Sequence, residues 1–258
     1  MPPTAAEAMA ARFRAARAGP DEAVLEGFHA LKHALRFGAD VRLVAAADAE
    51  ALERLAADLA PDLAGAFRAR AEVVPPAVLA TLAPRTPPTR VVAIARRPAA
   101  DAAAVLAGAA GHVVLLEDPR HLGNVGAVVR VGAAAGAGGV LTTGARDPWD
   151  PAALRGSAGL HFALPVARLG DAETTDPLAR LPAGRALVAL DPDGEPLRPG
   201  TLPPAAVLAF GTERHGLGEE LLSRANARVA IPMRPGVSSL NLATAVAVVL
   251  YACMLGPA

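Results

Sequence analysis

The stretch HVVLLEDPRHLGNVGAVVR, residues 112–130, decides the fold of the larger part of this chain. Its first half is a continuous apolar run, which is typical of a strand buried on both faces of a parallel sheet. Its second half is a glycine-bearing loop that leads into an apolar, helix-like segment. The stretch therefore predicts a strand–loop–helix unit with Asn124 at the loop and Arg130 in the helix that follows it.

Similar apolar runs continue beyond this stretch. They are GVLTT, ALVALD, AAVLAF and RVAI, and helix-like segments separate most of them. Parallel strands with helical connections predict an open α/β sheet, and such sheets bind ligands beyond the carboxyl ends of their strands. Two more loops follow strands in this way, namely GTERHGLG at 211–218 and PMRPGVSSLNLA at 232–243. We expect the three loops to share one site.

The first hundred residues alternate between short helical and strand patterns. LEGFHALKHALRFG, residues 25–38, predicts one helix that includes Leu25 and stops at Gly38. VRLVAA then predicts a strand, and DAEALERLAADLA predicts a second helix with Asp48 as its N-cap. The region is interpreted as a small α/β domain.

Length and composition limit the classes of protein. The chain has 258 residues, which at roughly 150 residues per domain suggests one large domain or two small ones. The change of pattern along the chain favours two domains, at 1–100 and 101–258. The formal net charge is zero, so a nucleic-acid partner would need a local basic patch. One cysteine, Cys253, excludes an internal disulfide and indicates a reducing, cytoplasmic location.

Neither a membrane span nor a metal site is expected. The longest apolar run, Leu242 to Leu255, is too short for a span of about 20 residues and predicts a buried core helix. No Cys/His cluster with metal-ligand spacing and no GxxxxGK[ST] phosphate loop occurs.

Each polar residue of the three loops has a plain structural explanation when taken alone. Asn124 could cap a helix, Arg130 could be a solvated helix residue, and Glu213 could be a surface acid. His215 could be an ordinary loop histidine. The serines and the asparagine of the third loop could simply cap the last helix; they are Ser238, Ser239 and Asn241.

Taken together, the loops resemble the three motifs of the SpoU (TrmH) family of RNA ribose 2′-O-methyltransferases in the SPOUT superfamily. The matches are NVGAVVR, GTERHGL and IPMRPGVSSLNLATAVAVVLY, with LRGSAGLHFALPV as the connecting segment, and they cover about residues 112–256. The N-terminal VLEGFHALKHAL is similar to the opening of the family's L30e-like RNA-binding domain. TPPTRVVAIA departs from the Gln-Gly pair that many members carry there, which leaves the RNA target open.

The resemblance implies a fold, a cofactor and partners. The implied fold is α/β, with a C-terminal SPOUT-type parallel sheet that threads a deep trefoil knot and a small N-terminal L30e-like domain. The implied cofactor is S-adenosyl-L-methionine, and the implied partners are RNA, either rRNA or tRNA, and a second copy of the chain in a homodimer. The residues implied to bind the cofactor are Gly211, Thr212, Ile231, Pro232, Met233 and Leu240.

The resemblance also implies roles in catalysis. Arginine is a poor general base because its pKa exceeds about 12. We therefore expect Arg130 to clamp an RNA phosphate and to stabilise the developing alkoxide, with Asn124 positioning Arg130 or the ribose. Glu213, Ser239 and Asn241 would hold the loops and the arginine by hydrogen bonds.

The helix-like stretch near the N-terminus supplies further candidates for RNA contact. They are Arg12, Arg14 and Arg17, with Arg96 and Arg97 near the end of the first region. A merely solvated basic face is an equal alternative. For the whole chain, a non-catalytic RNA-binding protein that retains the SPOUT fold stays open, and a Rossmann oxidoreductase is disfavoured because no GxGxxG motif occurs.

Overall fold

The computed structural model describes residues 3–108, 111–170, 181–182, 184–212 and 215–255. The chain forms two compact units. Unit 1 comprises Met1–Ala99 and Trp149–Ala163, and unit 2 comprises Ala100–Pro148 and Leu164–Ala258.

Unit 1 is built on a four-stranded sheet of order β1-β4-β2-β3, in which only the β2–β3 pair is parallel. Its elements are α1 (Ala5–Ala18), β1 (Glu22–Glu26), α2 (Phe28–Arg36), β2 (Val41–Ala46), α3 (Ala49–Leu59), η1 (Pro61–Leu63), α4 (Ala64–Arg70), β3 (Ala71–Val73), α5 (Pro76–Leu82), β4 (Val91–Arg96), α8 (Pro151–Gly156) and η2 (Leu160–Phe162).

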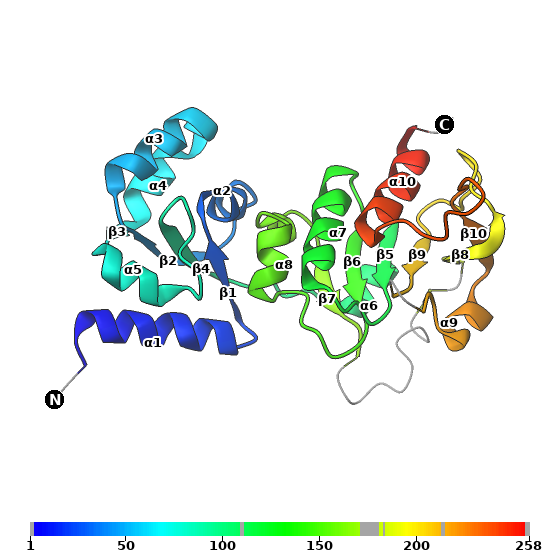
Figure 1. The fold of residues 1–258 in the computed structure, drawn as a ribbon, viewed down its shortest axis with the longest axis horizontal. Helices are drawn as coiled ribbons and strands as arrows, with labels where there is room; N and C mark the ends of the chain where they lie inside the picture. The colour runs from blue at the N-terminus through cyan, green and yellow to red at the C-terminus, as the bar shows by residue number, and fades with distance from the viewer. Residues whose placement is uncertain (1–2, 109–110, 171–180, 183, 213–214, 256–258) are drawn as a thin grey trace. The chain divides into compact units, whose positions relative to one another are not determined.

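Helices cover both faces of this sheet (Figure 1). On one face, Phe13 of α1 and Leu79 of α5 pack against Ile94 of the sheet in one buried cluster. On the other, Phe28 of α2 stacks on Phe67 of α4 with ring centroids 4.9 Å apart. The predicted small α/β domain thus has a core of its own.

The predicted helix over residues 25–38 is wrong at its start. Leu25 lies in β1 and pairs with Ala93 of β4, and the chain then turns at Gly27, whose φ is 98°. Helix α2 begins only at Phe28. The apolar spacing of Leu25 fits a helix as well as a strand, and pairing with β4 decides for the strand. By contrast, the predicted cap of α3 is confirmed, because the Asp48 side chain accepts a hydrogen bond from the Ala51 N–H at 2.9 Å.

The segment Trp149–Ala163 packs into unit 1 although it follows β6 in the chain. A Cβ at Gly159 would lie 2.5 Å from the Ala30 carbonyl oxygen, so α2 approaches this turn directly. The His33 Nδ1 lies 2.7 Å from the Ala158 carbonyl oxygen. The predicted division at residue 100 is close to the first break between the units, and no pattern in the sequence signals this return of the chain.

Unit 2 is built on a six-stranded sheet of order β10-β8-β9-β5-β6-β7, and every neighbouring pair is parallel. The predicted α/β fold with a parallel sheet is therefore confirmed. Its elements are α6 (Ala102–Ala107), β5 (Val113–Leu116), α7 (Leu122–Ala134), β6 (Gly139–Thr142), β7 (Val166–Arg168), β8 (Leu187–Pro196), β9 (Val207–Phe210), α9 (Glu219–Arg224), β10 (Ala227–Ala230) and α10 (Leu242–Leu255).

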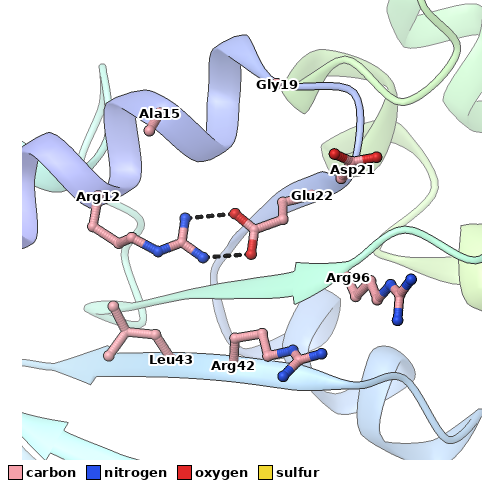
Figure 2. A pocket seen from close by; sticks show the side chains of 8 residues that line it. All are labelled: Arg12, Ala15, Gly19, Asp21, Glu22, Arg42, Leu43 and Arg96. Atoms are coloured by element: carbon pink, nitrogen blue, oxygen red, sulfur yellow. Dashed lines mark hydrogen bonds and ion pairs between the residues drawn. The ribbon is translucent and has the colours of Figure 1, made fainter.

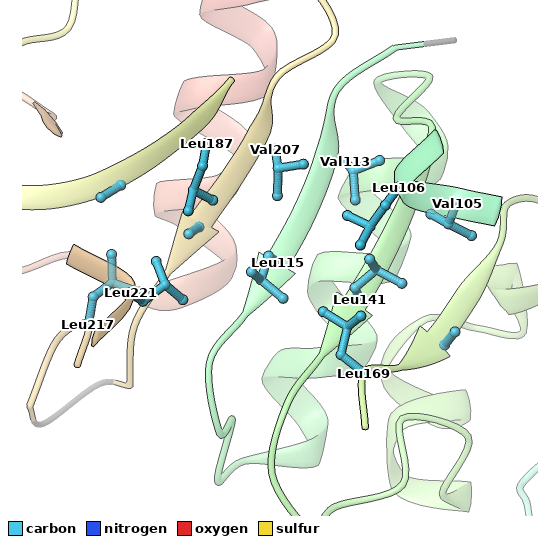
Figure 3. Packing of buried hydrophobic residues seen from close by; sticks show 13 residues of the cluster. Val105, Leu106, Val113, Leu115, Leu141, Leu169, Leu187, Val207, Leu217 and Leu221 are labelled. Carbon is cyan, nitrogen blue, oxygen red and sulfur yellow. The ribbon is translucent and has the colours of Figure 1, made fainter. Parts of the chain in front are cut away.

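Both faces of the second sheet are also covered, which explains why its strands are continuously apolar. Leu115 and Leu141 belong to the cluster that packs under α6 and α9 (Figure 3). The opposite face carries α7 and α10, which pack side by side (Figure 1). Because β5, β9 and β10 run parallel, the loops that follow them meet at one edge of the sheet. Among the described residues, no helix is long and apolar enough to cross a membrane.

Candidate functional site

Two asparagines join the first turn of α7 to the loop before α10. The Asn241 Nδ2 donates a hydrogen bond to the Asn124 Oδ1 at 3.2 Å. The Asn241 Oδ1 accepts from the Ala243 N–H at 3.0 Å and the Thr244 N–H at 3.3 Å, so its predicted helix-capping role is confirmed. The alternative that Asn124 caps α7 is wrong, because His121 occupies the N-cap position and Asn124 lies inside the first turn.

The loop after β9 folds back tightly on itself. The backbones of Thr212 and Gly216 exchange hydrogen bonds of 3.0 and 3.1 Å. A Cβ at Gly211 would lie 1.9 Å from the carbonyl carbon of Gly216, so only glycine fits there. Of the predicted residues in this loop, Glu213 lies outside the described residues.

Glu117 ties this loop to the end of β5. Its Oε2 accepts a hydrogen bond from the Gly218 N–H at 2.6 Å, and its own N–H belongs to the β5–β9 pairing through the Phe210 carbonyl oxygen. Glu117 is half-buried. Glu117 is not among the residues that the sequence motifs single out, although its place directly after a buried strand is a signal visible in the sequence.

The second and third loops, together with part of β8, line an open pocket of about 590 Å³. Five of the six residues predicted to bind the cofactor line it, namely Gly211, Thr212, Ile231, Met233 and Leu240, together with Ser239. Among the described residues, Pro232, Asn124, Arg130 and Asn241 are not part of its lining. The structure therefore brings most of the predicted binding residues together and places the asparagine pair outside the pocket wall.

The pocket also carries charged residues that the sequence analysis did not single out. Asp191 follows the buried part of β8, and its side chain is only 13% exposed. Its Oδ1 accepts a hydrogen bond from the Asp193 N–H at 3.1 Å, and its Oδ2 lies 3.7 Å from the Arg228 Nη1. His215, which the sequence analysis weighed only as a loop histidine, lies in the lining as well. The signal for Asp191 was an acid at the end of a buried strand.

Arg130 stands apart from this pocket within one chain. It lies on α7 six residues after Asn124, and six residues at about 100° each turn it to another side of the helix. Its side chain is exposed. No described residue forms a hydrogen bond or an ion pair with its guanidinium.

The three N-terminal arginines have different environments. Arg12 forms a two-pronged ion pair with Glu22 (Figure 2), and this pairing lowers the pKa of Glu22. Arg17 donates to the Leu82 carbonyl oxygen and lies 3.7 Å from the nearly buried Glu26. Arg14 is exposed. The three guanidinium groups therefore do not form one patch. In the described part of the chain, no three His, Cys, Asp or Glu side chains are placed to hold a metal ion.

Known proteins are similar to this chain in sequence and in fold. A model of the SpoU rRNA Methylase family matches residues 111–251. A 23S rRNA (adenosine(1067)-2'-O)-methyltransferase of Streptomyces laurentii is 34% identical over 168 residues, which are 63% of this chain and 61% of that protein. A 23S rRNA (uridine(2479)-2'-O)-methyltransferase of Streptomyces viridochromogenes is 34% identical over 170 residues, 64% of this chain and 59% of that protein. The chain thus spans about three fifths of the length of these relatives.

The similarity extends to solved structures. The SpoU methyltransferase AviRb of Streptomyces viridochromogenes, crystallised in complex with the cofactor AdoMet, superposes with a TM-score of 0.74 at 26% identity. The match covers 96% of this chain and 97% of that one, so it includes both compact units. Because the family model matches more than half of the sequence, the chain belongs to the SpoU rRNA Methylase family.

Proposed function

We propose that the chain is an S-adenosyl-L-methionine-dependent RNA methyltransferase that methylates a ribose 2′-hydroxyl of rRNA or tRNA. The observation that carries this proposal is the pocket between the loops after β9 and β10, which lies at the same sheet edge as the Asn124–Asn241 pair. The names of its relatives as rRNA 2′-O-methyltransferases support the reaction class.

The pocket suits this cofactor in size and chemistry. Its volume of about 590 Å³ falls in the range of small-molecule sites. Leu190, Leu217 and Ile231 offer apolar walls to an adenine ring. The carboxylate of Asp191 would complement the ammonium and sulfonium charges. When bound, the cofactor supplies an electrophilic methyl group on its sulfonium.

The residues of this chain would orient the attacking hydroxyl and manage its charge. A ribose 2′-hydroxyl is a weak nucleophile that must be positioned and relieved of its proton. The planar, always charged guanidinium of Arg130 is suited to a bidentate grip on the neighbouring phosphate and to the developing alkoxide. Asn124 and Asn241 would keep the first and third loops in register around the hydroxyl. Ser239 would hold the third loop, and Glu213 the second.

A homodimer is part of the proposal. Helix α10 carries no charged residue, and Val248, Met254 and Leu255 on it are 39%, 51% and 76% exposed. Exposed apolar side chains on a charge-free helix favour burial against another protein surface. Sedimentation of the purified protein should show a dimer, and Val248→Glu should shift it toward the monomer.

The two halves of the chain would have different roles. Residues 1–100 would bind the RNA substrate, and residues 101–258 would form the knotted catalytic domain. Arg12, Arg14 and Arg17 stay predicted phosphate contacts, of which exposed Arg14 needs the least rearrangement. Charge-neutral variants should weaken RNA binding and flatten its salt dependence. A cytoplasmic location remains a prediction from cysteine content.

Two measurements test the function. Calorimetry with S-adenosyl-L-methionine should show one site per chain, and the complete lack of binding up to millimolar ligand would overturn the proposal. Transfer of a tritiated methyl group to bulk rRNA or tRNA, followed by nuclease digestion, should yield 2′-O-methylated nucleotides. The non-catalytic RNA-binding alternative predicts RNA binding with neither result.

A further inference from the structure

Phenylalanine is scarce in this chain, and its side chains differ in exposure. The sequence contains six phenylalanines. Four are at most 3% exposed, and they are Phe13, Phe28, Phe67 and Phe210. The other two are Phe37, which is 46% exposed, and Phe162, which is half-buried. These two line the same hollow of about 700 Å³, which we call the Phe37–Phe162 hollow.

Local structure holds both rings at this hollow. Phe37 is the C-cap residue directly after α2, and its N–H donates to the His33 carbonyl oxygen at 3.0 Å, which fixes its backbone. Phe162 lies at the end of η2, where its ring meets Trp149 edge-on with centroids 5.3 Å apart. Phe37 comes from the N-terminal sequence and Phe162 from the returning segment Trp149–Ala163. Phe162 therefore reaches the hollow because that segment belongs to unit 1.

Guanidinium groups border the hollow. Arg96 and Arg97 belong to its lining, and Arg96 also lines an adjoining hollow with Arg12 and Arg42 (Figure 2). The Arg42 guanidinium pairs with Asp40 at 2.6 Å. Arg96 is exposed, and no described residue pairs with its guanidinium. The surface thus combines two accessible aromatic rings with an unpaired positive charge.

Aromatic side chains next to arginines can bind an unstacked nucleobase. Proteins that bind single-stranded RNA stack bases on aromatic side chains and hold the adjoining phosphates with cationic groups. Asp21 of the same lining could accept a hydrogen bond from a base N–H. A base inside a duplex stays stacked on its neighbours, so it could not enter.

We propose that the Phe37–Phe162 hollow holds one unstacked base of the RNA substrate, with Arg96 on its phosphate. This inference rests on the proposed function and adds to it a substrate class, namely RNA that offers an unpaired nucleotide. It predicts that ring removal weakens binding of single strands and leaves binding of duplexes unchanged.

The test uses the full chain and two fluorescein-labelled probes, a single-stranded RNA of about 12 nucleotides without self-complementarity and the same RNA in a duplex. Fluorescence anisotropy at fixed salt gives both dissociation constants. Phe37→Ala should weaken the single strand between about 5-fold and about 140-fold, which is the range for one lost base–aromatic stack. Phe37→Trp should retain binding because it keeps a ring.

Leu59→Ala is the matched control, since Leu59 is also 46% exposed in unit 1 but is not part of the hollow. It should leave both constants unchanged. Equal binding of the single strand by wild type and Phe37→Ala, or equal loss on both probes, would overturn the inference. Cofactor calorimetry on Phe37→Ala keeps the two proposals apart, because it should match wild type whatever the RNA result.

Discussion

The Nδ2 of Asn241 donates a hydrogen bond to the Oδ1 of Asn124 across 117 positions of sequence. The two amides couple the first turn of α7 to the cap of α10, so Asn241 both caps one helix and holds the start of another. These two roles use different atoms of Asn241, and substitutions can separate them.

Asn241→Asp should keep stability and lose activity, whereas Asn241→Ala should lose both. The aspartate retains the oxygen that caps α10 but has no N–H for Asn124. Removing an asparagine cap costs about 0.5–2 kcal/mol. Urea unfolding and single-turnover methylation measure the two effects. If Asn241→Asp unfolds as easily as Asn241→Ala, the cap is not what Asn241 contributes.

Gly211→Ala should lower the affinity for the cofactor more than about tenfold. The added Cβ would lie 1.9 Å from the Gly216 carbonyl carbon, so the loop must open before the residue fits. A glycine beside a ligand often serves to let the ligand approach the backbone, but at Gly211 the close neighbour is the loop's own backbone.

Gly123→Ala is the control for this substitution. Nothing lies within 4 Å of a Cβ at Gly123, and this position is helical. The change should stabilise the fold by about 0.5–1 kcal/mol and leave calorimetry with the cofactor unchanged. Wild-type affinity in Gly211→Ala would show that the loop does not shape the pocket.

Glu117→Ala should weaken cofactor binding without a matching loss of fold. Its carboxylate holds the Gly218 N–H at 2.6 Å and thereby fixes the end of the loop that lines the pocket. Glu117→Gln keeps an acceptor oxygen and should restore most of the affinity. Calorimetry measures the affinity of both variants for the cofactor, and Glu72→Ala, at an exposed position, is the control. If Glu117→Gln loses as much affinity as Glu117→Ala, the charge of Glu117 is what matters.

The parts of the fold that sequence predicts well are those that local chemistry determines. Strands β5, β6 and β9 are buried on both faces, which leaves a continuous apolar run, and Asp48 caps the helix it precedes. The parts that it misses depend on partners distant in sequence. Leu25 has helical spacing, and only pairing with Ala93 makes it a strand residue.

The candidate site divides in the same way. The glycines and asparagines of the loops are visible as motifs, so Gly211 and Asn241 were predicted from the sequence. Asp191 lies between Ala189 and Glu195, where the register of β8 with β10 shifts, and this part of β8 lines the pocket. No local pattern reports that pairing. The same holds for Phe162, whose position depends on the return of the chain to unit 1.

Stability should fall on acidification partly through His112. Burial lowers the pKa of its imidazole, whose Nδ1 is buried without a hydrogen-bond partner in the described part of the chain. In the unfolded chain, His112 is therefore protonated as the pH falls through the ordinary histidine pKa of about 6.5. In the folded chain, its imidazole stays neutral at that pH. Stabilisation from neutral His112 is present above that pH and is lost as the pH falls.

Unfolding by urea at about pH 7.5 and about pH 5.5 measures this loss. His112→Asn should show a smaller decrease in unfolding free energy between the two conditions than wild type. The same substitution at exposed His29 should leave the decrease unchanged. If the unfolding free energy decreases equally in His112→Asn and wild type, other groups cause the acid sensitivity. Half-buried His33 would then be the next candidate, because burial lowers its pKa too.

Arg130→Ala should lower the methylation rate by about 10²–10³ and leave cofactor affinity unchanged. The affinity should stay unchanged because Arg130 is exposed on α7 and is not part of the pocket lining. Arg130→Lys should rescue poorly, since a point charge cannot reproduce the bidentate fork of a guanidinium.

Arg54→Ala, which removes an exposed arginine from α3 in unit 1, is the matched control and should methylate at the wild-type rate. Single-turnover methylation at saturating RNA and cofactor is the deciding measurement, because it isolates the chemical step from binding. A near-wild-type rate in Arg130→Ala would make Arg130 an ordinary solvated helix residue and would remove the phosphate clamp from the mechanism.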